Sequence, residues 1–92
     1  MKLSQLTKKK VHIIGINGIG MSALAIYLKK NKIDVSGSDI AKNSNTDVLN
    51  RNGIKVIIGH KEENIKNKDI IFYSSAIKNN PEIKAAKKNN IP

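Results

Sequence analysis

Short apolar runs alternate with amphipathic stretches along the whole chain. Residues 11–16 contain four apolar β-branched side chains, a pattern typical of a strand buried on both faces of a parallel sheet. From Met21 to Leu28, apolar residues recur at i, i+3, i+4 and i+7 and so share one face of a helix. The same alternation continues with strands predicted over 33–38, 56–58 and 69–73, a helix from Ser44 to a stop at Gly53, and a last helix from Asn80 to Asn89.

This order of elements predicts an α/β fold. Because strands and helices alternate with short connections, we expect a Rossmann-like, doubly wound parallel sheet of four to five strands with flanking helices. The fifth strand would begin at Ile91. Ligands of such sheets bind beyond the carboxyl ends of the strands. The predicted ends are Gly15–Gly20, Ser38–Asp39, Gly59–His60 and Ser74–Ile77.

Three glycines follow the first predicted strand. Gly15, Gly18 and Gly20 are expected to allow a sharp turn, a close approach of ligand to backbone, and tight packing of the helix on the strand. The turn aims backbone N–H groups and the positive end of a helix dipole at one point, which suits a phosphate or diphosphate. The dinucleotide fingerprint G-x-G-x-x-G would need glycine at position 17. Asn17 weakens a nicotinamide interpretation, although its amide can donate to a phosphate.

Other polar residues lie at the same predicted edge. Asp39 stands 19 positions after Gly20, close to the offset of the acid that binds ribose hydroxyls in dinucleotide folds. His60 is either a contact to a base or an ordinary loop residue. Ser74 and Ser75 either donate to a ligand or form a serine turn. His12 lies early in the first strand, away from this edge, where packing or surface hydrogen bonding is expected.

Capping residues predict where the helices begin and end. Ser44 is the expected N-cap of the second helix, with Asp47 three residues on. Asn31 is expected to end the first helix, in a conformation that can be left-handed. Asn80 is the expected N-cap of the last helix, with Pro81 at its first position and Glu82 as the acid of its first turn.

Composition narrows the class of protein further. The 92 residues form one domain, and the absence of cysteine excludes disulfides and thiolate metal sites and fits a cytoplasmic location. No signal peptide or membrane-length apolar run is present, so no membrane partner is expected. The net charge of +10 is carried by dispersed lysines without interleaved aromatics, which argues against nucleic-acid binding. No catalytic or metal-binding constellation is evident, so we predict no catalytic residue and no metal site.

Six short motifs occur in an order and spacing that together are specific. They are His12–Ser22, Ser36–Asp39, Gly59–His60, Ser74–Ile77, Asn80–Ile83 and Ile91–Pro92. On these motifs the chain resembles the N-terminal domain of the Mur ligase family.

The resemblance implies a domain, residues 1–92, that binds the UDP part of UDP-N-acetylmuramate. It places the diphosphate at the glycine turn, on Gly15, Asn17, Gly18, Ile19, Gly20 and Met21. It places the uridine among Ser38, Asp39, His60, Ser74, Ser75, Ala76 and Ile77. Family members usually carry glycine where Asn17 stands, so the resemblance supports its diphosphate contact least.

The resemblance also implies a reaction for the full-length enzyme. ATP and Mg²⁺ convert the muramyl carboxylate to an acyl phosphate, which the amine of L-alanine attacks in cell-wall precursor synthesis. A related family activity attaches a recycled peptide instead, and the sequence leaves both open. No G-x-x-x-x-G-K-[ST] loop occurs here, so the central ATPase and C-terminal domains are expected to be absent and the fragment to be inactive alone, without a cofactor of its own. The alternative to a UDP-binding Mur ligase domain is a nicotinamide-dinucleotide-binding domain of a dehydrogenase or ion-transport regulator.

Overall fold

The computed structural model describes residues 3–74, 77, 80–89 and 91. Within these residues, three α-helices and four strands follow one another along the chain; one short 3₁₀-helix precedes the first strand and a second connects the third strand to the fourth. In chain order they are η1 (Leu3–Gln5), β1 (Lys10–Ile14), α1 (Ile19–Lys30), β2 (Asp34–Asp39), α2 (Ser44–Arg51), β3 (Lys55–Ile58), η2 (Glu62–Ile65), β4 (Ile70–Tyr73) and α3 (Pro81–Lys88).

The four strands form one parallel sheet in the order β3-β2-β1-β4. The chain leaves β1 toward β2 and β3 and then returns to place β4 on the other side of β1, so the strand order reverses beside β1. This confirms the predicted doubly wound α/β sheet. Ile91, where a fifth strand was expected to begin, lies outside any strand, and Pro92 lies outside the described residues.

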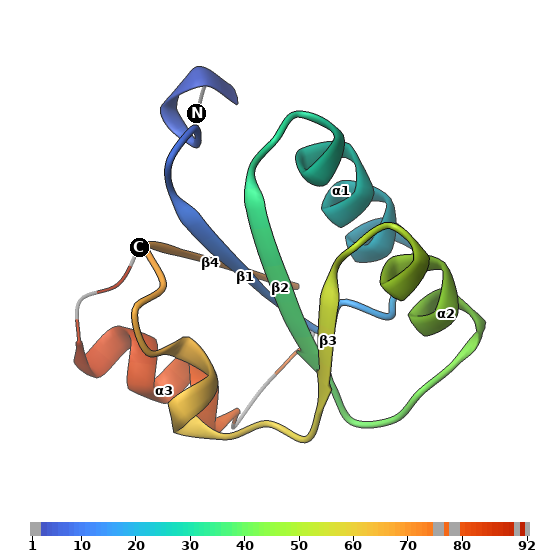
Figure 1. The fold of residues 1–92 in the computed structure, drawn as a ribbon. Helices are drawn as coiled ribbons and strands as arrows, with labels where there is room; N and C mark the ends of the chain where they lie inside the picture. Colours follow the sequence, from blue (N-terminus) through green and yellow to red (C-terminus); the bar gives the residue numbers. More distant parts are fainter. Residues whose placement is uncertain (1–2, 75–76, 78–79, 90, 92) are drawn as a thin grey trace.

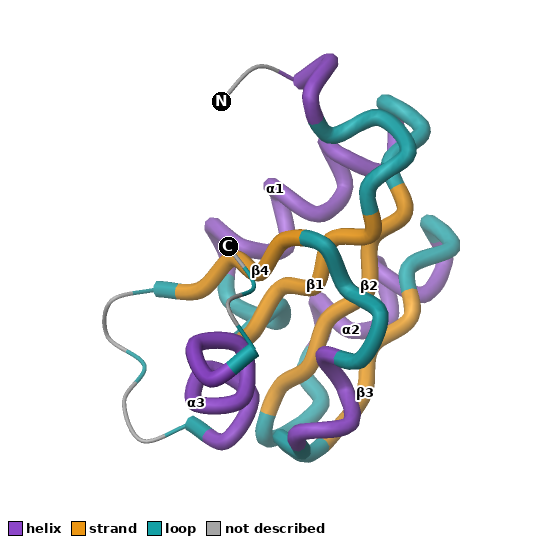
Figure 2. Tube along the Cα trace, turned by 90° about the vertical axis from the view of Figure 1, so that its left-hand side faces the viewer, coloured by secondary structure: helices purple, strands orange, loops and turns teal. Residues whose placement is uncertain are grey.

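Helices cover both faces of the sheet. Figure 1 shows α1 and α2 on one side and α3 on the other, and Figure 2 looks from the α3 side, with α3 in front of the strands. The side chains of β1 alternate between these layers. Val11 and Ile13 belong to the larger apolar cluster with Ala25 and Leu28 of α1, whereas Ile14 belongs to a smaller cluster with α3. The continuous apolar run predicted as a doubly buried strand is therefore confirmed.

One predicted cap is wrong by one residue, and another predicted cap has a different conformation. The N-cap of α2 is Asn43, not Ser44: Asn43 Oδ1 accepts from the Asn45 N–H at 2.9 Å, and Thr46 Oγ1 accepts from the Asn43 N–H at 3.0 Å. The box is shifted because the Thr46 hydroxyl, rather than the Asp47 carboxylate, turns back on the cap. Asn31 is the C-cap of α1, as predicted, but its φ is −93°, and the left-handed residue is Lys32, with φ 64°.

The last helix begins as predicted. Asn80 is the N-cap of α3, and its Oδ1 accepts from the N–H groups of Glu82 and Ile83 at 2.8 and 3.2 Å. Pro81 occupies the first helical position, where its missing N–H would have no partner. The cap therefore fixes Glu82 in the first turn, directed at the sheet.

One glycine lets the loop after β1 cross the neighbouring strand. A Cβ on Gly37, in the middle of β2, would lie 2.6 Å from Ile16 Cβ and 2.7 Å from the carbonyl oxygen of Ile13. Only a residue without a side chain fits under Ile16 here. Among the described residues, no helix has the length and apolar character needed to cross a membrane.

Candidate functional site

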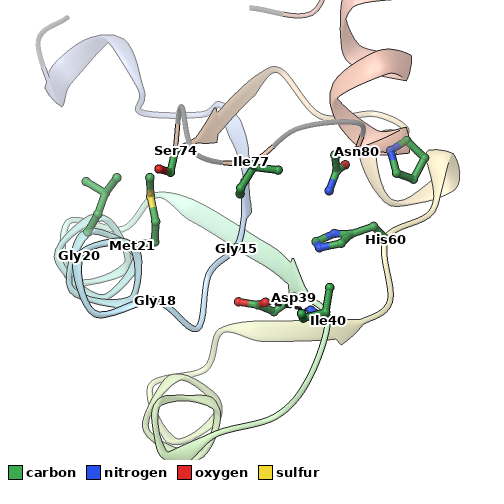
Figure 3. A pocket seen from close by; sticks show the side chains of 12 residues that line it. Gly15, Gly18, Gly20, Met21, Asp39, Ile40, His60, Ser74, Ile77 and Asn80 are labelled. Atoms are coloured by element: carbon green, nitrogen blue, oxygen red, sulfur yellow. Dashed lines mark hydrogen bonds between the residues drawn. The ribbon is translucent and has the colours of Figure 1, made fainter.

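An open cleft of about 900 Å³ lies at the carboxyl edge of the sheet, a size suited to a nucleotide-sized ligand. Its walls come from the ends of all four strands and from the first turns of α1 and α3 (Figure 3). It is lined by Gly15, Gly18, Gly20, Met21, Leu24, Asp39, Ile40, His60, Ser74, Ile77, Asn80 and Pro81.

Most of the residues predicted from the sequence meet at this cleft, but not all line it. Ser38 is fully buried behind the wall, and Asn17 is also buried and does not line the cleft. Ile19 is 86% exposed beside it. Ser75 and Ala76 lie outside the described residues. Sequence reasoning missed four lining residues, Leu24, Ile40, Asn80 and Pro81.

The first N–H groups of the turn between β1 and α1 form hydrogen bonds within the protein. The N–H groups of Gly15 and Ile16 both donate to the Ser38 carbonyl, at 2.8 and 3.1 Å. The Gly18 N–H donates to the Gly15 carbonyl at 3.1 Å. Gly15 adopts φ 80°, and Ile77 packs against the space its side chain would fill. These amides are therefore engaged within the protein.

The next three amides are available to a ligand. Within the described part of the chain, the N–H groups of Ile19, Gly20 and Met21 have no hydrogen-bond acceptor, because the first bond of α1 runs from Ser22 N to the Gly18 carbonyl and no side chain caps the helix. The helix dipole adds partial positive charge at the same point. This is the kind of geometry that binds phosphate groups.

Gly20 serves the cleft and not the packing of α1 on the sheet. A Cβ built on Gly20 meets no atom within 4 Å, so the expected tight helix–strand contact is wrong at this position. Gly20 instead lines the cleft. Close packing is instead required at Gly37.

Asn17 joins the glycine turn to the segment between β2 and α2. Its N–H donates to Asp39 Oδ2 at 2.9 Å and its side-chain Nδ2 to the Ala41 carbonyl at 2.7 Å. Its carbonyl accepts from the side-chain amides of Asn43 and Asn45. The side chain is 2% exposed, and Oδ1 is buried without a partner among the described residues. The donor groups of Asn17 are thus turned away from any phosphate in the cleft.

Asp39 supports the same turn from the end of β2. Its Oδ2 accepts from Asn17 N, and its Oδ1 accepts from the Ile40 N–H at 2.8 Å. Each carboxylate oxygen therefore keeps one lone pair for another donor. Since Asp39 also lines the cleft, those lone pairs are accessible to a ligand hydroxyl.

A buried polar network lies behind the cleft, between the sheet and α3. Its centre is Glu82, fully buried, whose carboxylate accepts four hydrogen bonds. Oε1 accepts from His12 Nε2 at 2.6 Å and from Ser38 Oγ at 2.8 Å. Oε2 lies 2.9 Å from His60 Nδ1 and accepts from Asn64 Nδ2 at 3.1 Å. Four donors occupy the four lone-pair positions of an ionised carboxylate.

These hydrogen bonds keep Glu82 charged. Burial raises the pKa of the carboxyl, but the donors His12, Asn64, Ser38 and His60 together outweigh burial and lower the pKa from 4.5 to about 2. His12, which also lies 3.0 Å from Ser36 Oγ, is fully buried in this network. Of its two predicted roles, packing and surface hydrogen bonding, the second is wrong, because its hydrogen bonds to Glu82 and Ser36 are buried. Sequence reasoning assigned Glu82 only to a helix turn. The available signal was three polar residues, His12, Ser36 and Ser38, at inward positions of apolar strands.

Comparison with known proteins identifies the family. A sequence profile described as "Mur ligase family, catalytic domain" matches residues 10–92. The chain is 52% identical over 85 residues to UDP-N-acetylmuramate--L-alanine ligase of Aquifex aeolicus, covering 91% of this chain and 19% of that protein. A similar protein from Wolbachia, with the same name, is 46% identical over 91 residues, covering 98% of this chain and 17% of its own length.

Solved structures show the same likeness. The crystal structure of UDP-N-acetylmuramate-alanine ligase from Thermotoga maritima matches with a TM-score of 0.86 and 36% identity, covering 91% of this chain and 20% of that one. The UDP-N-acetylmuramate:L-alanyl-γ-D-glutamyl-meso-diaminopimelate ligase of Neisseria meningitides matches with a TM-score of 0.84 and 27% identity, covering 91% and 27%. The present chain spans about a fifth of the length of the curated relatives it matches.

Proposed function

Because the chain belongs to the Mur ligase family, we propose that its cleft binds UDP-N-acetylmuramate through the uridine diphosphate group. The observation that carries this proposal is the set of three N–H groups, on Ile19, Gly20 and Met21, without acceptors in the described structure and beside an open cleft. A diphosphate supplies the acceptors and the negative charge that these groups lack.

The uridine would lie toward β2, β3 and β4. The free lone pairs of Asp39 suit ribose hydroxyls, and His60 and Ser74 offer polar atoms to a base. Ile40 and Ile77 supply apolar surface for the ring faces. Of the residues predicted from the sequence, Asn17, Gly15 and Gly18 would shape the turn, because their N–H groups are already bonded within the protein.

We also propose that the longer protein joins L-alanine to UDP-N-acetylmuramate in peptidoglycan precursor synthesis, with ATP and Mg²⁺. The relatives at 46 and 52% identity carry that ligase name, whereas the diaminopimelate-containing peptide ligase is 27% identical. Residues 1–92 contain no G-x-x-x-x-G-K-[ST] loop. ATP would therefore be bound by another part of the protein, and this domain would supply the substrate.

Amide chemical shifts test the binding proposal. The ¹⁵N-labelled chain is titrated separately with UDP, NADH and a random DNA duplex. UDP is expected to shift the amides of Ile19, Gly20 and Met21 most strongly, because their N–H groups gain acceptors. Binding of NADH without binding of UDP would instead favour the nicotinamide alternative. Salt-dependent binding of the duplex, without UDP binding, would favour a nucleic-acid-binding protein.

A further inference from the structure

The hydrogen atoms of the buried network can be assigned by counting donors and acceptors. Glu82 is ionised, so both of its oxygens only accept. Ser38 has one hydroxyl hydrogen and donates it to Glu82 Oε1. Toward His60 Nδ1, 3.0 Å away, Ser38 Oγ therefore offers a lone pair. Both neighbours of His60 Nδ1 are acceptors, and this nitrogen must carry a hydrogen.

The second ring nitrogen is left for the cleft. His60 lines the cleft with its side chain 14% exposed, and none of the described residues hydrogen-bonds to its Nε2. Figure 3 shows the ring entering the cleft between the side chains of Ile77 and Ile40. In a neutral imidazole one nitrogen donates and the other accepts. With the hydrogen on Nδ1, Nε2 presents a lone pair to the ligand.

We propose that Glu82 is a positioning residue, which holds His60 in the Nδ1–H tautomer so that Nε2 accepts a hydrogen bond from the imide N–H of a uracil. This inference rests on the proposed binding of a uridine nucleotide and adds how its base is selected. Uracil carries a hydrogen at N3, whereas cytosine presents a lone pair there. Cytosine would place that lone pair against Nε2, and both groups would lose their hydrogen bonds.

UDP and CDP form a matched pair for testing selection, because they share the ribose and the diphosphate. The wild-type chain is expected to bind UDP about 10- to 100-fold more tightly than CDP, the range expected when a site leaves a polar group unpaired. Equal affinities for the two nucleotides, measured by calorimetry, would overturn the inference.

The tautomer is read directly from the ring ¹⁵N shifts of His60 in the UDP complex. The Nδ1–H tautomer, the Nε2–H tautomer and the doubly protonated ring give distinct patterns. We expect the Nδ1–H form, with Nε2 as the nitrogen whose shift changes on adding UDP. Either of the other two forms in the complex would overturn the inference. A purely structural role for Glu82 makes no prediction about this spectrum.

Substitutions then separate Glu82 from general effects on folding. Glu82→Gln introduces an amide NH₂ into the network and frees His60 from a carboxylate acceptor, so the preference for UDP should fall to within about threefold. The exposed Glu63→Gln is the matched control and should keep the wild-type preference. An unchanged preference in Glu82→Gln would overturn the inference. If that variant does not fold, His60→Ala decides: retention of the preference there would equally refute it.

Failure of this inference differs from failure of the proposed function. If UDP shifts the amides of Ile19, Gly20 and Met21 but binds no better than CDP, diphosphate binding stands and base selection by His60 falls. If UDP produces no shifts at these amides, the proposed function itself falls.

Discussion

Acid should destabilise this protein through Glu82. The folded-state pKa of this carboxyl is about 2, below its ordinary value of 4.5, because four donors favour the charged form despite burial. A proton therefore binds Glu82 more weakly in the folded than in the unfolded chain. Its contribution to the free energy of unfolding is fully present above the unfolded pKa and is lost as the pH falls toward the folded pKa.

The size of this contribution follows from the two pKa values. The difference between a pKa of 4.5 in the unfolded chain and about 2 in the folded chain corresponds to roughly 3 kcal/mol of stability. Small domains are stable by only about 5–15 kcal/mol, so this one carboxyl accounts for a substantial share. The loss is expected between about pH 5 and about pH 2.

Urea unfolding at a series of pH values in this range measures the effect. The net charge of +10 also disfavours the folded state in acid, but it acts on wild type and variants alike. The informative quantity is therefore the difference between wild type and Glu82→Gln, which should shrink by roughly 3 kcal/mol as the pH falls. Glu63→Gln should stay parallel to wild type. Parallel curves for wild type and Glu82→Gln would refute the assignment of a low pKa to Glu82.

Three substitutions probe other parts of the structure. Gly20→Val should weaken UDP binding at least about tenfold, because it adds bulk at a position that lines the cleft. It should change the free energy of unfolding by less than about 1 kcal/mol, since its Cβ meets no atom within 4 Å, and unchanged affinity would contradict the site. Gly37→Ala should cost about 1–3 kcal/mol in urea unfolding because its Cβ overlaps Ile16, and a neutral result would contradict that contact. Asn80→Ala should cost about 1 kcal/mol by loss of the cap that orients Glu82, and an unchanged unfolding midpoint would refute it.

The parts of the fold that follow local rules could be predicted from the sequence. The β-branched run before Gly15 is buried on both faces, and the Asn80–Pro81 cap begins α3 where the residue types require. Strand ends of a parallel sheet must meet at one edge, so Asp39 and His60 were correctly expected beside the glycine turn. Each of these inferences needs only the period of the pattern and the chemistry of a cap or turn.

Two features that the sequence did not reveal depend on contacts between distant segments. Gly37 resembles any glycine in a strand until Ile16 is seen to cross it. Asn17 was assigned to a ligand because its spacing matched a phosphate turn, but the Ala41 carbonyl takes its amide. The N-cap of α2 moved by one residue for a local reason, because the side chains of Asn43 and Thr46 form the reciprocal capping bonds.

The two faces of the sheet differ in polarity, and this difference explains why the buried role of Glu82 could not be predicted from the sequence. The α1–α2 face is packed with apolar residues, so the hydrophobic pattern alone accounts for it. The α3 face buries a charge, which is costly unless donors surround it, and those donors come from β1, β2, and the segments after β3. No single segment of the sequence contains all of these donors, so the local pattern cannot predict the network. The same network ends at His60, which lines the cleft. One of the hydrogen bonds that offset the burial of Glu82 therefore comes from the residue proposed to recognise the base. The tautomer of His60 is for this reason the property to measure first.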